Sequence, residues 1–246
     1  SGIVDNYNLV INAVTNFVNI IFNSVISSFG NLIATETKER QYELFQVYRF
    51  FASWVYGFAV TGFFVLLTPL VRIWLGDAWV LPASAVALIL IDLYFKGDRI
   101  VLSNYKTAAG VFEQDKYLAL IQGGVNLVLS IWLVQKIGLA GIYVGTVISG
   151  MIANLTKPVI IYRVCFGRSS RSYFAESLRY AGTVAVLAAG LKLVGNRVMA
   201  QPAIGSFLLM VVIITLVFNG VFLLLFGRSR EFRYLKQVAL KKLGKV

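Results

Sequence analysis

The segment at residues 204–226, IGSFLLMVVIITLVFNGVFLLLF, contains no charged side chain. An α-helix needs about 20 predominantly apolar residues to cross a bilayer, and its backbone groups must be hydrogen-bonded within the segment. A transmembrane β-strand would instead alternate apolar and polar residues. This segment therefore predicts a transmembrane helix and decides the fold class.

The rest of the chain has the same character. Of its 246 residues, 58% are hydrophobic and 14% are charged, and the mean hydropathy is +0.76. Soluble domains usually have about 25% charged residues. Segments long and apolar enough to span a membrane lie at residues 7–28, 44–70, 80–105, 117–135, 139–162, 178–194 and 204–226. We therefore predict an all-α, polytopic membrane bundle of about seven transmembrane helices.

The segments suggest three parts. Residues 1–163 hold five predicted spans that form a core, residues 164–226 add two more, and residues 227–246 form a basic tail. Apolar side chains recur in this tail at helical spacing, which predicts an amphipathic helix drawn to anionic lipid of the inner leaflet. A solvated tail that only sets topology is the alternative. The chain begins at Ser1 without a signal peptide, so we expect a fragment or a processed chain.

The distribution of lysine and arginine predicts the orientation, because cytoplasmic loops hold an excess of both. If the first span runs from outside to inside, the outer loops hold only Arg72, Lys136 and Arg197, with Lys192 near that face, whereas the inner loops and tail hold Lys38, Arg40, Lys106, Lys116, Arg163, Arg168, Arg171, Arg179, Arg228, Arg230, Arg233, Lys236, Lys241, Lys242 and Lys245. We therefore predict a multi-pass protein of the bacterial inner membrane with a cytoplasmic C-terminus. This bias also accounts for the net charge of +12 without a nucleic-acid partner.

Several kinds of chemistry are disfavoured. The chain has no histidine and one cysteine, Cys165, so a His-based triad, an obvious zinc site and an internal disulfide are all excluded. We expect no catalytic residues, no metal and no cofactor. A membrane polymerase or acyltransferase is the main alternative, but no linker reaches much beyond about 15 residues, the length at which loops become functional modules.

The first span carries a line of asparagines. Asn8, Asn12, Asn16, Asn19 and Asn23 follow one another at steps of four or three residues, so they share one helix face. Carboxamides are costly in hydrocarbon and can donate and accept hydrogen bonds, so this face predicts a hydrated lumen for a hydroxyl-rich ligand. Hydrogen bonding between helices is the alternative.

The third span contains charged residues. Asp92, Lys96 and Arg99 stand at i, i+4 and i+7, with Asp98 beside them. Ionisable residues inside a membrane are functional candidates, and an Asp92–Lys96 pair would offset part of the desolvation cost. Arg99 would remain uncompensated if Asp98 faces elsewhere. Snorkelling of both cations to the interface is the alternative.

Two further cations extend this set. On the predicted topology Arg49, Lys96, Arg99 and Lys157 all fall in the cytoplasmic half of the bundle. Together they would make an inward-facing cavity cationic and attract an anionic headgroup. Positive-inside bias produces part of the same pattern.

The fourth and fifth spans contribute two more features. Gln122 and Asn126 stand one turn apart and are further candidates for the cavity. Gly138 predicts a tight turn between the spans, and Gly141 and Gly145 predict close packing of the two helices.

Four stretches carry a family resemblance: GIVDNY at residues 2–7, SFGNL at 28–32, IWLG at 73–76 and GLAGIYVGT at 138–146. Over most of residues 1–165 the chain resembles bacterial polysaccharide flippases of the multidrug/oligosaccharidyl-lipid/polysaccharide exporter superfamily. The resemblance implies two helical lobes around a hydrophilic cavity that work by alternating access. The chain would then be the carboxy-terminal lobe, and the amino-terminal lobe would be missing from it.

The resemblance also implies a substrate, a lipid-linked oligosaccharide of the undecaprenyl-pyrophosphate type, with membrane lipids as further partners. We infer from chemistry that the asparagine line would contact sugar hydroxyls and the inner cations the pyrophosphate. A drug/cation antiporter of the same superfamily is a further alternative. Such a protein would prefer buried carboxylates, and Asp92 is the one deeply placed acid in the sequence.

Overall fold

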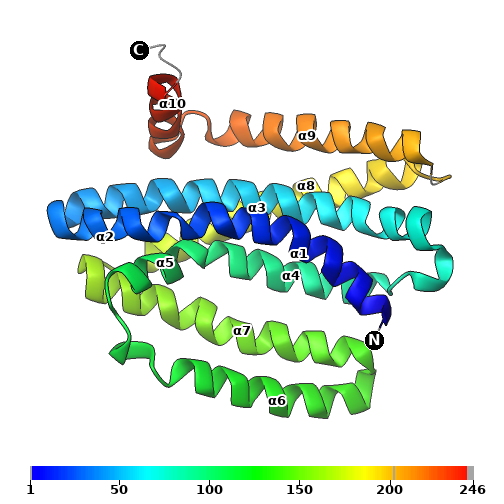
Figure 1. Cartoon of the computed structure of the whole chain (residues 1–246), viewed down its shortest axis with the longest axis horizontal. Coiled ribbons are helices and arrows are strands. Elements are labelled where there is room, and N and C mark those ends of the chain that lie inside the picture. The colour runs from blue at the N-terminus through cyan, green and yellow to red at the C-terminus, as the bar shows by residue number, and fades with distance from the viewer. Residues whose placement is uncertain (1, 202, 243–246) are drawn as a thin grey trace.

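The computed structural model describes residues 2–201 and 203–242, and every regular element among them is a helix (Figure 1). The α-helices are α1 (Gly2–Asn23), α2 (Val25–Thr35), α3 (Lys38–Leu75), α4 (Ala83–Asp98), α5 (Ile100–Ala108), α6 (Leu118–Ile137), α7 (Leu139–Ile161), α8 (Arg171–Val198), α9 (Ile204–Phe226) and α10 (Arg230–Lys242). Two 3₁₀ turns, η1 (Asp77–Trp79) and η2 (Glu113–Asp115), and a π-helical turn, η3 (Tyr162–Phe166), complete the chain. The predicted all-α membrane bundle is confirmed.

Six helical stretches are long and apolar enough to cross a membrane: Gly2–Thr35, Lys38–Leu75, Glu113–Ile137, Leu139–Phe166, Arg171–Val198 and Ile204–Phe226. Each contains one of the predicted spans, and the last agrees with its prediction at both ends. The helix predicted in the basic tail is present as α10.

The third predicted span, 80–105, is the exception, because the chain is divided at Arg99 into α4 and α5. Helix α4 has 16 residues, fewer than the roughly 20 that a span requires. Arg99 itself has φ −96° and ψ 1°, outside the α-helical region. The side chains of Asp98 and Arg99 bond to different helices, α8 and α7, and we attribute the break to these two attachments.

The helices lie side by side, and their connections alternate between the two ends of the bundle (Figure 1). Helices α4 and α5 together make one crossing. Helix α3 is central and contacts α1, α4, α8 and α9, whereas α6 lies at the edge against α7. The connections predicted to be rich in cations gather at the end where α10 lies across the bundle. The assignment of this end to the cytoplasm stays a prediction.

The outer surface of the bundle is apolar. Leu120 of α6 is 75% exposed and Leu224 of α9 is 85% exposed. Large exposed apolar surfaces of this kind mark contact with a membrane or a partner protein. The interior is built around α3, where Phe50 packs on Phe222 and the Trp54 Nε1 donates to Asn219 Oδ1 at 2.8 Å.

The hairpin of α6 and α7 depends on glycine. Gly138 has φ +66°, and it reverses the chain between the two helices, so the predicted tight turn is confirmed. A Cβ atom at Gly141 would lie 2.4 Å from the backbone carbonyl carbon of Leu133. The predicted close packing is therefore confirmed as well.

Candidate functional site

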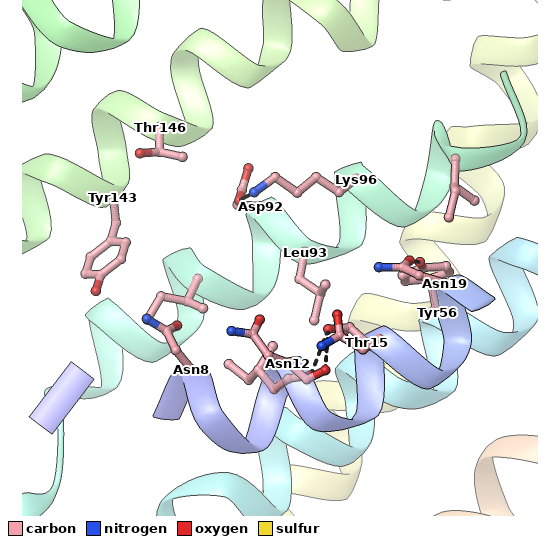
Figure 2. A pocket seen from close by; sticks show the side chains of 14 residues that line it. Asn8, Asn12, Thr15, Asn19, Tyr56, Asp92, Leu93, Lys96, Tyr143 and Thr146 are labelled. Atoms are coloured by element: carbon pink, nitrogen blue, oxygen red, sulfur yellow. Dashed lines mark hydrogen bonds and ion pairs between the residues drawn. The ribbon is translucent and has the colours of Figure 1, made fainter. Parts of the chain in front are cut away.

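A polar groove of about 430 Å³ lies between α1, α4 and α7 (Figure 2). Its lining consists of Asn8, Ile11, Asn12, Thr15, Asn16, Asn19, Tyr56, Ile89, Asp92, Leu93, Lys96, Ile100, Tyr143 and Thr146. Four of the five asparagines predicted to share a face of the first span are in this list. The structure thus brings the asparagine line and the charged third span to one place.

The asparagines differ in their surroundings. Asn12 and Asn16 are exposed, and their side chains make no hydrogen bond to any other described residue. Asn19 instead accepts a hydrogen bond of 2.5 Å from the hydroxyl of Tyr56 on α3. Asn23 is exposed but lies outside the groove. Asn12 and Asn16 are therefore available to a ligand, whereas Asn19 also joins α1 to α3.

Asp92 and Lys96 form the expected ion pair, with 2.6 Å between Asp92 Oδ2 and Lys96 Nζ. Both side chains come from α4 and stand in the groove (Figure 2). The Lys96 side chain is 56% exposed, so its ammonium group keeps donors that can reach a ligand. Among the described lining residues these two carry the only charges, and the groove is therefore close to neutral.

The nearly neutral charge of the groove differs from the cationic charge that the sequence predicted for the cavity. The position of Arg99 is one reason. Its Nη1 donates to the carbonyl oxygen of Gly150 at 3.2 Å and to the side-chain oxygen of Asn154, both on α7. Asp98 does face elsewhere: its Oδ2 accepts from Ser177 Oγ at 2.8 Å. Arg99 therefore ties α4 to α7 and does not line the groove.

Arg49 is the second reason. Its side chain is 1% exposed, and its Nη1 lies 2.6 Å from Glu176 Oε2 on α8. Its Nη2 donates to the Tyr173 carbonyl at 2.8 Å and to Ser177 Oγ at 2.6 Å. The expectation that Arg49 would share a cavity with Lys96 is corrected, because the acid on α8 holds it on another side of α3.

The remaining candidates also lie outside the groove. Lys157 is half-buried, with its Nζ 3.4 Å from Ser103 Oγ. Asn126 Nδ2 donates to Thr146 Oγ1 at 3.2 Å, so it joins α6 to α7 and supports a lining residue from behind. Gln122 is half-buried on α6 and absent from the lining.

Sequence reasoning missed four polar lining residues: Thr15, Tyr56, Tyr143 and Thr146. Tyr56, Tyr143 and Thr146 stand in largely apolar runs, whereas Thr15 lies three residues after Asn12 and four before Asn19 and so shares the face of the asparagine line. Tyr143 and Thr146 are three residues apart and so share a face of α7, which is the one signal that could have indicated them. Their place opposite α1 depends on packing between distant segments.

The groove offers carboxamides, hydroxyls and one ion pair, which suit a ligand rich in hydroxyl groups. Within the residues that the structure describes, no group of three or more His, Cys, Asp or Glu side chains could hold a metal ion. Comparisons of the chain with protein-family models, curated proteins and solved structures give no match. The groove itself therefore carries the functional argument.

Proposed function

We propose that the chain is one lobe of an alternating-access transporter that moves a lipid-linked oligosaccharide across the bacterial inner membrane. The observation that carries the proposal is the set of carboxamides on α1 that make no hydrogen bond to another described residue and that line a groove in a bundle with an apolar outer surface. Polar side chains in a membrane helix face a bundle interior or a watery cavity. A groove of this kind lets a hydroxyl-rich molecule pass through an apolar layer.

Each group in the groove has a proposed part. Asn12 and Asn16 hydrogen-bond to sugar hydroxyls, because a carboxamide both donates and accepts. Lys96 binds the phosphate next to the sugar through the donors that Asp92 leaves unused. Arg99 positions α4 against α7 and does not touch the substrate.

If the chain is a polysaccharide flippase lobe, as the resemblance implies, a second lobe would lie opposite this groove. Leu9 and Phe17 of α1 are 60% and 67% exposed, and they lie beside the asparagine line in the sequence. We propose that this part of α1 contacts the second lobe and that the two lobes together enclose the substrate.

A drug/cation antiporter is the second candidate, and Asp92 favours it. The Asp92 carboxylate lines the groove and is 16% exposed, which suits a cationic ligand or a coupling ion. In that case Asp92 would bind the cation, and Lys96 would neutralise the Asp92 carboxylate when no cation is bound. The two candidates therefore differ in which member of the pair the transported molecule requires.

The experiment measures surface polysaccharide restored by each variant of the full-length transporter in a flippase-deficient strain, normalised to protein level. Lys96→Gln should lower restoration about tenfold, because a charge-assisted hydrogen bond is worth about 1.5–3 kcal/mol. Lys116→Gln, an exposed lysine of a connecting loop, is the matched control and should restore fully. Full restoration by Lys96→Gln would contradict the proposal. Cation export that requires Asp92 would support the antiporter.

A further inference from the structure

A second polar cleft lies against α10. This helix lies crosswise to the other helices at the cation-rich end of the bundle (Figure 1). The main chamber of the cleft, of about 650 Å³, lies between α10, the start of α3 and the start of α8. A smaller chamber of about 170 Å³ adjoins it, and the two share Gln46, Glu176 and Glu231. The cleft has no lining residue in common with the groove.

The main chamber carries charges of both signs, from Glu39, Arg40, Glu43, Arg168, Glu176, Arg230, Glu231 and Arg233. Arg40 pairs with Glu43 at 3.1 Å, and Glu176 pairs with Arg49 at 2.6 Å. The other three arginines and two glutamates form no ion pair with any residue that the structure describes. The cleft therefore presents a cationic set and a smaller anionic set to a ligand.

Tertiary packing builds this cleft. Phe232 holds α10 in place, with its ring 5.9 Å from that of Trp54 on α3. Arg168 lies over the ring of Tyr42, 4.4 Å from its centroid. At the inner end lies Arg49, which lines the smaller chamber and is 1% exposed, and its Nε has no hydrogen-bond partner among the described residues. The site thus retains a buried donor as well as its exposed charges.

We propose that the cleft binds the headgroup of phosphatidylethanolamine from the surrounding membrane. The phosphate would lie among Arg168, Arg230 and Arg233, because guanidinium groups match phosphate oxygens in geometry and charge. The ammonium group would donate to Glu39 and Glu231. This site goes beyond the proposed transport and does not depend on it.

The charge pattern favours this headgroup over others. A glycerol headgroup has no cation, so the phosphate would leave Glu39 and Glu231 without a partner. A choline headgroup has a cation but no N–H donor for a carboxylate. A lipid is favoured over a soluble phosphate ester because α10 is a basic, amphipathic helix at the end of a membrane bundle, where such helices contact the bilayer.

The test uses native mass spectrometry of the whole chain in detergent, with equal amounts of phosphatidylethanolamine, phosphatidylglycerol and phosphatidylcholine that share the same acyl chains. Retention of phosphatidylethanolamine should exceed that of each of the others by about tenfold. The double variant Arg230→Gln/Arg233→Gln should remove this preference. Lys236→Gln, which removes a charge from α10 outside the cleft, should keep it.

Two further variants lie outside α10, so their effect does not depend on how that helix folds. Arg168→Gln changes a residue outside α10 and should also lower the retention of phosphatidylethanolamine, whereas Glu39→Gln should reduce its advantage over phosphatidylglycerol. Equal retention of the ethanolamine and choline lipids would overturn the proposal. Stronger retention of phosphatidylglycerol would also overturn it, because simple attraction to anionic lipid would then be sufficient. Displacement by an equal concentration of soluble phosphoethanolamine would overturn the lipid as the source of the headgroup.

Discussion

The substitution Arg49→Met tests whether this arginine clamps α3 to α8. Methionine keeps most of the length and the apolar stem of the side chain but removes every donor. The variant loses the ion pair with Glu176 and the hydrogen bonds to the Tyr173 carbonyl and to Ser177. It also loses the stacking of the guanidinium on the Tyr173 ring, at 3.8 Å from the centroid.

The structure sets the size of the effect. Removing one partner of a buried ion pair usually costs about 3–5 kcal/mol. Glu176 is 33% exposed and can hydrate when Arg49 is gone, so we expect the lower end, about 3 kcal/mol. Glu176→Gln should cost only about 1 kcal/mol, because Arg49 keeps its bonds to Tyr173 and Ser177 and an amide oxygen can still accept.

The assay is the unfolding free energy of the purified chain in mixed micelles, titrated with a denaturing detergent. The double variant Arg49→Met/Glu176→Gln completes a cycle with the two single variants, and we expect a coupling energy of about 2 kcal/mol. A cost below about 1 kcal/mol for Arg49→Met would refute the clamp. The transport rate per folded molecule of the full-length transporter should stay unchanged in the Arg49→Met variant. If Arg49 bound the substrate, the substitution would lower this rate.

Three further predictions concern packing, the groove and topology. Gly141→Leu should separate α6 from α7 and lower the amount of folded protein several-fold, as measured by fluorescence-detected gel filtration, whereas Gly124→Leu, with nothing within 4 Å of its Cβ position, should be tolerated. Cysteines at Asn12 and Asn16 should react with a water-soluble thiol reagent in the full-length protein, and one at buried Val18 should be protected; the opposite pattern would mean that the line packs against other helices. Reporter fusions after positions 39, 115 and 170 should report cytoplasm, and those after 77, 136 and 201 the outside; two contrary loops would contradict the topology.

The sequence predicts the helices well because each span carries its own apolar signal. Residues 204–226 show this best, since their flanks carry Pro202 on one side and Gly227 with Arg228 on the other. The break at Arg99 could not be predicted in this way. It depends on bonds to α7 and α8, segments that lie some 50 and 75 residues away along the chain.

The candidate site also has features that the local sequence predicts and features that depend on contacts between distant segments. The asparagine line and the Asp92–Lys96 pair are local patterns within single helices, so periodicity was sufficient to predict them. The position of Arg49 was not accessible, because its partner Glu176 is 127 residues away. A basic residue near the cytoplasmic end of a span has the same sequence signature whether it lines a cavity, anchors at the interface or pairs with a distant acid.

The most direct test of the proposed function is the rate at which the full-length transporter moves a lipid-linked oligosaccharide across proteoliposome membranes. The double variant Asn12→Leu/Asn16→Leu removes two of the groove carboxamides that make no hydrogen bond to another described residue, and Leu224→Ala alters an exposed apolar residue of α9 outside the groove as the control. Two neutral hydrogen bonds are worth about 1–3 kcal/mol together, so the double variant should be about tenfold slower, and the control should match the wild type. A wild-type rate in the double variant would contradict the assignment of the groove as the path of the sugar.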